Sequence, residues 1–151
     1  WTSGYWAMFT LGRILAGLYA ARLGIDRMVQ GGLIAALLGA LLLWWNPVPV
    51  ANLAAVALIG LAVAPIFPAM ISGTRFRVGA RLAANTIGLQ MAVIGLGGSL
   101  IPGLIGVLAR RTSLEIVPVV LVVLFLTLIG LYRLALTTGA RATRQEEGYA
   151  A

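Results

Sequence analysis

The chain has no cysteine and no histidine among its 151 residues, and it has only four acidic residues. These absences exclude disulfide bonds, thiol nucleophiles, imidazole bases and the usual histidine or thiolate ligands of zinc. The acids Asp26, Glu115, Glu146 and Glu147 all lie outside the long apolar stretches. No carboxylate pair is therefore available inside those stretches for acid–base catalysis. We expect a protein that is not an enzyme and that holds no metal ion and no cofactor.

Charge is scarce as well. Charged residues make up 10% of the chain and hydrophobic residues 61%, whereas a soluble domain has about 25% and about 45–50%. The mean hydropathy is +1.01. All eleven basic residues are arginines, and the net charge is +7. They form short clusters between apolar runs, a pattern typical of membrane topology rather than of nucleic-acid binding. The composition predicts an all-α, polytopic integral membrane bundle without a nucleic-acid partner.

The apolar residues fall into segments of the length that crosses a bilayer, which is about 20 residues for a helix. Five such spans are predicted, at about 2–21, 28–45, 49–72, 83–107 and 115–136. Small residues recur in them at four-residue spacing, which lets helices approach one another closely. The remaining segment, 137–151, is polar and rich in small residues, and we expect a disordered cytoplasmic tail there.

The arginines predict an orientation, because cytoplasmic loops of membrane proteins are enriched in basic residues. If the five spans alternate, eight arginines lie on one side and two on the other. The richer side should be cytoplasmic, which places the C-terminus in the cytoplasm and the protein in the inner (cytoplasmic) membrane. Trp1 and the pair Trp44–Trp45 fall at the opposite, outer interface, where aromatic rings are favoured. The chain starts at Trp1 directly in apolar sequence, and we expect it to be a fragment of a longer protein.

One charge lies inside a predicted span. Arg13 precedes the loop residue Arg22 by nine positions, so it should lie roughly 13 Å from the cytoplasmic loop at 1.5 Å per residue. A charge at the bilayer centre costs at least ~2.5 kcal/mol and usually faces a bundle interior or a water-filled path. Two interpretations remain open. Arg13 either bonds backbone carbonyls or an acid elsewhere in the protein, or it contacts a solute or an ion.

Polar amides supply the other candidate contacts. Gln90 should lie at a depth similar to that of Arg13, with Asn85 a little over one turn away on the same span. Asn52 enters the third span from the outer side. Each amide either makes an interhelical hydrogen bond, worth about 0.6 kcal/mol in membranes, or contacts a solute in a central cavity. Asn52 belongs with Asn85 and Gln90 in the group of candidate cavity residues.

Two prolines lie toward the cytoplasmic end of the third span, Pro65 and Pro68, with Phe67 between them. A proline removes a helical hydrogen bond and bends the helix. The bend is either a static adaptation to packing or the hinge of a gate. Phe67 is a further candidate cavity residue, and a cavity dominated by such aromatic rings favours efflux of amphipathic compounds.

The run GRILAGLYAARLGIDR, residues 12–27, resembles the signature cytoplasmic loop of the major facilitator superfamily. Four positions of that motif match in register: Gly17, Arg22, Gly24 and Arg27. In the family, an aspartate of the motif helps to hold a closed state by contacting a neighbouring helix end and the motif arginine. Ala21 occupies the aspartate position here, and the acid Asp26 is displaced from it.

Two further segments, GLAVAPIFPAMIS and AANTIGLQMAVIGLGGSLIPGLIGVLARR, resemble the tenth and eleventh helices of the fucose-permease-like, sugar-transporting branch. The resemblance implies that the chain supplies helices eight to twelve of a twelve-helix transporter, whose two bundles rock about a central site. The span 49–72 would line the cavity, and 2–21 and 83–107 would flank it. The implied partners are the bilayer, the N-terminal half of the same protein, and a small solute with a coupling proton.

The sequence therefore predicts a fragment of a secondary active transporter, a permease or symporter that moves a small polar solute such as a sugar by alternating access. Two alternatives stay open. One is drug or metabolite efflux by a member of the same superfamily. The other is a membrane scaffold or assembly subunit that transports nothing.

Overall fold

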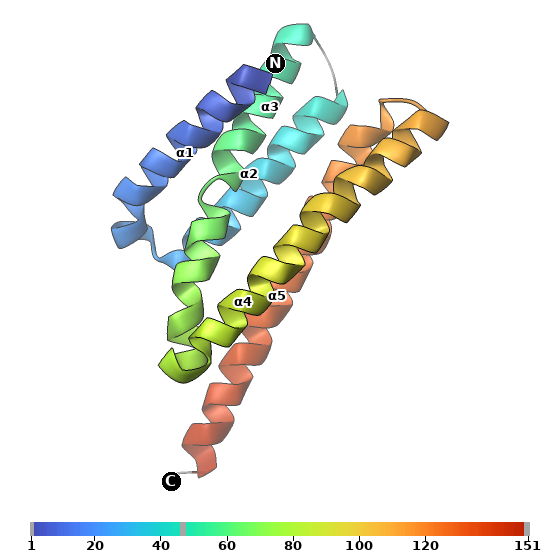
Figure 1. Ribbon diagram of the computed structural model, residues 1–151. Coiled ribbons are helices and arrows are strands. Elements are labelled where there is room, and N and C mark those ends of the chain that lie inside the picture. Colours follow the sequence, from blue (N-terminus) through green and yellow to red (C-terminus); the bar gives the residue numbers. More distant parts are fainter. Residues whose placement is uncertain (1, 46–47, 150–151) are drawn as a thin grey trace.

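The computed structural model is helical over most of the chain that it describes, with short turns between the helices (Figure 1). It describes residues 2–45 and 48–149, with the side chains at 2–3, 19–23 and 139–149 outside that description. No strand occurs in these ranges, so the all-α prediction is confirmed. The helices are α1 (Thr2–Leu23), α2 (Ile25–Trp45), α3 (Pro49–Val63), α4 (Ile66–Arg111) and α5 (Ile116–Tyr149).

Long apolar helices dominate the molecule. Within the described residues, three stretches are long and apolar enough to cross a membrane: Ile25–Trp45, Pro49–Arg111 and Ile116–Thr138. The second stretch contains both the third and the fourth predicted span. Because these helices have the length and composition of transmembrane segments, the chain has the character of a membrane-spanning protein. The finer expectation of five separate spans remains a prediction.

Two junctions differ from the sequence prediction. The predicted span 49–72 is divided by a turn at Ala64 and Pro65, where α3 ends and α4 begins. Pro65 has no amide hydrogen to continue the helical ladder. The predicted loop 73–82 is instead part of α4, which bends sharply at Gly79 (φ 75°, ψ 164°). Only glycine adopts such a backbone geometry readily. A bend at this one residue therefore changes the chain direction where a ten-residue loop was predicted.

The C-terminal segment also differs from expectation. α5 is helical as far as Tyr149, whereas the sequence predicted a disordered tail from Thr137 onward. From Thr137 to Tyr149 the segment has two alanines, two arginines, one glutamine and two glutamates, which are good helix formers. Continuation of a helix already begun in the apolar part of α5 is therefore cheaper than starting a new one.

Close glycine contacts set the packing of α1, α2 and α3. A methyl group added at Gly12 on α1 would lie 2.5 Å from the carbonyl oxygen of Leu61 on α3, and one at Gly32 on α2 would lie 2.7 Å from that of Ala62. These contacts let the backbones meet, as the small-residue spacing predicts. They also hold Gly12 and Gly32 at one level, opposite neighbouring residues of α3. α2 packs in addition against α5.

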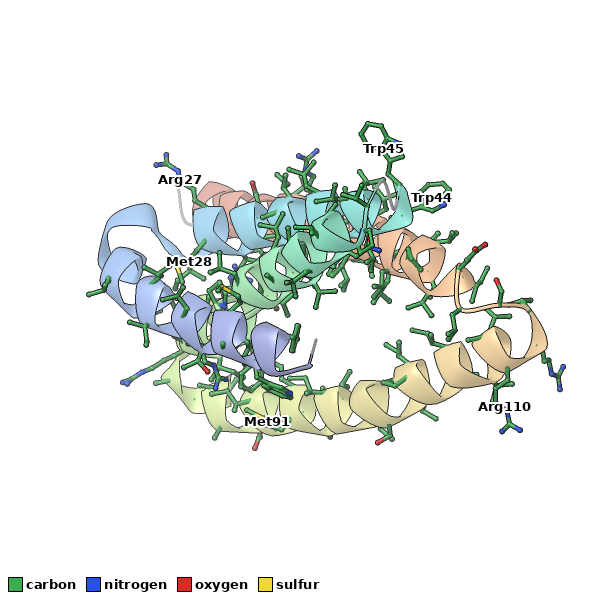
Figure 2. The ribbon with its side chains drawn as sticks, turned by 90° about the horizontal axis from the view of Figure 1, so that it is seen from above. Arg27, Met28, Trp44, Trp45, Met91 and Arg110 are labelled. Carbon is green, nitrogen blue, oxygen red and sulfur yellow. The ribbon has the colours of Figure 1, made fainter. Side chains whose placement is uncertain are left out.

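The part of α4 after Gly79 lies apart from this core. Figure 2, seen from above, shows it separated from α5 except near the turn that joins them, with its residues Met91 and Arg110 across the structure from Trp44 and Trp45 of α2. Large apolar side chains along it are exposed, among them Leu89, Leu96 and Leu104.

Candidate functional site

A triangle of polar side chains joins three helices. The Arg77 guanidinium donates through Nη2 to Oδ1 of Asp26 and to the Tyr132 hydroxyl, the second bond at 3.1 Å. The Tyr132 hydroxyl donates in turn to Oδ1 of Asp26 at 2.8 Å. Asp26 lies in the first turn of α2, Arg77 just before the Gly79 bend of α4, and Tyr132 on α5. We call these three residues the Asp26 cluster.

The local structure explains each member of the Asp26 cluster. Gly24, with φ 75°, separates α1 from α2, so Asp26 falls in the first turn of α2, where a helix dipole favours negative charge. The ring of Tyr132 is only 8% exposed, and the Arg77 guanidinium lies 5.7 Å from its centroid. The charged side chains themselves are 41% and 55% exposed. The buried ring of Tyr132 thus positions its hydroxyl against the Asp26–Arg77 ion pair, which remains accessible to water.

A second polar contact spans the Gly79 bend. Thr74, which is 4% exposed, directs its hydroxyl at the Met70 carbonyl oxygen (2.9 Å) and at Oε1 of Gln90 (3.1 Å). The two halves of α4 are therefore joined by a side-chain hydrogen bond above the bend. This contact is of the interhelical kind, which was one of the two interpretations of Gln90.

Arg13 has an aromatic neighbour. Its guanidinium lies 5.2 Å from the centroid of Phe9, one turn earlier on α1, within the distance of a cation–π contact. Arg13 follows Gly12, which packs on Leu61 of α3. Arg13 therefore lies near the middle of α1, beside a residue that packs on the last turn of α3. Its side chain is exposed.

The remaining sequence candidates are dispersed. Asn85 and Phe67 are exposed on α4, on opposite sides of the Gly79 bend. Asn52 is half-buried and lines an open hollow of about 740 Å³ with Trp44 and Trp45. The structure does not bring these residues together into one site.

The predicted gate and signature loop can also be located. Pro65 lies in the turn before α4 and Pro68 in its first turn, so the break predicted from these prolines is present. Gly17 and Arg27 are exposed. The side chain of Arg22 and the whole of Trp1 lie outside the described residues.

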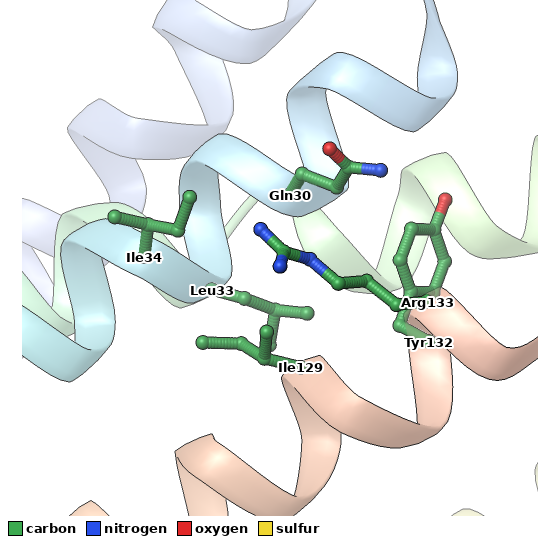
Figure 3. Close-up of a pocket in the computed structure, with 6 residues that line it drawn as sticks. All are labelled: Gln30, Leu33, Ile34, Ile129, Tyr132 and Arg133. Atoms are coloured by element: carbon green, nitrogen blue, oxygen red, sulfur yellow. The ribbon is translucent and has the colours of Figure 1, made fainter.

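Two spaces adjoin Tyr132. One is an apolar cavity of about 330 Å³, lined among others by Val63, Met70, Phe125 and Leu131. The other lies between α2 and α5, where Arg133 reaches toward Gln30 (Figure 3). The second space measures about 10 Å³, which is at most the room for one water molecule. It is a packing gap and not a solute site.

Comparisons with known proteins add no relative. No protein-family model matches the chain, and neither the curated proteins nor the solved structures give a significant match.

Sequence reasoning did not single out Arg77 or Tyr132 as site residues. Arg77 was counted only for topology, and Tyr132 is one aromatic residue in an apolar run. Their partner Asp26 is 51 and 106 residues away in the chain. The available signal was the displaced acid Asp26 beside the signature loop, which needed a basic partner at a neighbouring helix end.

Proposed function

We propose that this chain forms the C-terminal helices of a secondary active transporter that moves a small polar solute across the cytoplasmic membrane by alternating access. Three features support this. Three stretches of the described chain, Ile25–Trp45, Pro49–Arg111 and Ile116–Thr138, have transmembrane length and composition. The loop at 12–27 resembles the signature loop of the major facilitator superfamily. The observation that carries the proposal is the Asp26 cluster, because it gives that loop an acid with a partner on a neighbouring helix.

The resemblance implies an acid that holds one state closed by contacting a neighbouring helix end and an arginine. Ala21 cannot do this. Asp26, in the first turn of α2, accepts a hydrogen bond from Arg77 near the bend of α4. The displaced acid thus has the geometry that the missing one would need. Tyr132 extends the contact to α5.

The energetics suit a contact that breaks and reforms in every cycle. Both charged side chains are roughly half exposed, and exposed ion pairs contribute only about 0.2–1 kcal/mol. Hydrogen bonds between membrane helices are similarly weak, about 0.6 kcal/mol on average. A two-state transporter needs its states to differ by no more than a few kcal/mol. The cluster can therefore bias the closed state without locking it.

The arginines near the Asp26 cluster support a cytoplasmic assignment of this end of the helices. Hydrogen bonds hold Asp26, Arg77 and Tyr132 at one level. Four further arginines lie within four residues of them in the chain: Arg27, Arg75, Arg81 and Arg133. We assign this end to the cytoplasm by the excess of arginine. The C-terminus then lies in the cytoplasm, and the hollow beside Trp44 and Trp45 opens at the outer face.

Uptake by the intact protein tests the proposal. Proteoliposomes are loaded with buffer, and entry of a radiolabelled hexose is followed with and without an inward proton gradient. We expect gradient-dependent entry, and we expect Asp26→Asn and Arg77→Gln each to change the rate severalfold. Arg110→Gln, on the exposed outer end of α4, is the matched control and should leave it unchanged.

Two results would count against this assignment. If hexoses, hexuronates and aromatic acids all failed to enter the proteoliposomes, the proposed transporter function would be refuted. If Asp26→Asn and Arg77→Gln both took up solute at the normal rate, the proposed role of Asp26 in holding the closed state would be refuted, and the transport function would still stand.

A further inference from the structure

One face of α1 carries a row of aromatic rings that ends in a cation. Trp6 and Phe9 meet edge to face with centroids 5.7 Å apart, and Tyr5 stacks on Phe9 at 6.0 Å. The Arg13 guanidinium lies 5.2 Å from the Phe9 centroid. Trp6 is 57% exposed. A flat apolar surface and a positive charge therefore stand side by side on open helix surface.

Trp6 and Arg13 are the exposed members of this row, whereas Tyr5 packs against Gly60 of α3. Gly12 is buried against the backbone of α3, where the carbonyl oxygen of Leu61 leaves no room for a methyl group. Arg13, the next residue, is turned away from that contact and is exposed. Leu61 lies in the last turn of α3, and Arg13 lies near the middle of α1. In the proposed transporter, the depth of the cation follows from its sequence position, nine residues before Arg22.

A positive charge at this depth needs an anion, because an unneutralised charge in a membrane is expensive. Two acids have side chains in the described part of the chain. Asp26 is paired with Arg77. Glu115 is in the turn between α4 and α5 and lines the hollow beside Trp44. Neither is the partner of Arg13.

We infer that the open face of α1 binds a monocarboxylate that carries a ring, which narrows the solute of the proposed transporter from a neutral sugar to a ring acid. The inference rests on that proposed function. The planar guanidinium offers parallel N–H donors that match the two oxygens of a carboxylate. The ring of the solute packs on Trp6, as sugar and aromatic rings do on indole. A neutral sugar makes the second contact only and leaves the charge unneutralised.

Binding to the intact protein in lipid nanodiscs tests this inference with D-glucuronate and D-glucose, which share a ring and differ in the carboxylate. We expect glucuronate to bind at least about tenfold more tightly, since hydrogen bonds to charged groups are the stronger ones. Arg13→Gln should remove this preference by weakening glucuronate and not glucose. Arg13→Lys should retain part of it, because it keeps the charge and loses the planar fork. Arg110→Gln is the control and should retain all of it.

The outcomes separate the two proposals. Equal binding of the two probes, or an unchanged preference in Arg13→Gln, overturns the ring-acid inference, and glucose uptake would then still support a transporter. Loss of thermal stability in both Arg13 variants together with unchanged relative affinities also overturns it, because Arg13 then pairs within the protein. Failure of both probes to bind overturns the ring-acid inference, and the transporter proposal falls only if hexoses, hexuronates and aromatic acids all fail to enter proteoliposomes.

Discussion

The close contact between α1 and α3 predicts how much a substitution at Gly12 changes the free energy of unfolding. A methyl group at Gly12 would lie 2.5 Å from the Leu61 carbonyl oxygen and 3.0 Å from the Ala64 methyl. The first neighbour is backbone and cannot rotate away. Gly17, on the same helix, has no atom within 4 Å of the corresponding position. Gly12→Ala and Gly17→Ala thus make the same chemical change in a closed and in an open environment.

The matched pair isolates the packing energy. Each substitution gains about 1 kcal/mol of helix propensity, because glycine is that much poorer than alanine in a helix. Only Gly12→Ala forces the helices apart, and overpacking of this kind costs about 1–3 kcal/mol. The propensity gain cancels in the difference. We therefore expect Gly12→Ala to be less stable than Gly17→Ala by about 1–3 kcal/mol, which is the overpacking cost alone.

Unfolding of the purified protein in mixed detergent–SDS micelles measures this difference as a free energy of unfolding. Gly88→Ala, on the open part of α4 with no atom within 4 Å of the added methyl, is a second control and should behave like Gly17→Ala. If the Gly12 variant were as stable as the two controls, α1 would not lie on α3 as described. The level assigned to Arg13 would then also be wrong.

The bend of α4 and the Asp26 cluster give three further predictions. Gly79→Ala should destabilise the protein by about 1–2 kcal/mol, because alanine is strained at a φ of 75°; a stability equal to wild type in the same SDS titration would contradict the bend. Tyr132→Phe, which keeps the buried ring and removes two hydrogen bonds, should cost about 1 kcal/mol. A double-mutant cycle with Asp26→Asn should show coupling, and additive effects would mean that the bonds do not form. The Asp26–Arg77 pair is half exposed, so raising the salt concentration should weaken it, and the destabilisation by Arg77→Gln should shrink at 1 M salt; a salt-independent effect would mean that the pair is shielded from solvent.

Helix boundaries that depend on local chemistry were predictable from the sequence. The third span was placed to start at residue 49, and α3 does begin at Pro49, because proline is favoured in the first turn where no amide donor is needed. The second span was placed to end at Trp45, as α2 does. Hydropathy and turn residues together fix such ends without any tertiary contact.

The Gly79 bend was not predictable by the same means. The segment 73–82 carries three arginines and two glycines, and this polarity resembles that of a loop. In the structure it is helix up to the bend, because one residue with positive φ is enough to reverse the chain. Pro65 shows the converse. It was expected to bend a continuous helix and instead separates two helices.

Arg77 and Arg13 show that the position of a residue along the chain can indicate a candidate site residue but not its contact partners. Arg77 falls in a polar segment and was counted only for topology, whereas Arg13 falls in an apolar run and was assigned either a structural or a solute-contacting role. Tertiary contacts give Arg77 an acid and a hydroxyl from two other helices, and no periodicity could pair residues so distant in the chain. Arg13 has only an aromatic face within the described structure. The two acids with described side chains lie elsewhere, Asp26 with Arg77 and Glu115 in the turn after α4, and this is the reason for testing a carboxylate solute against a neutral one.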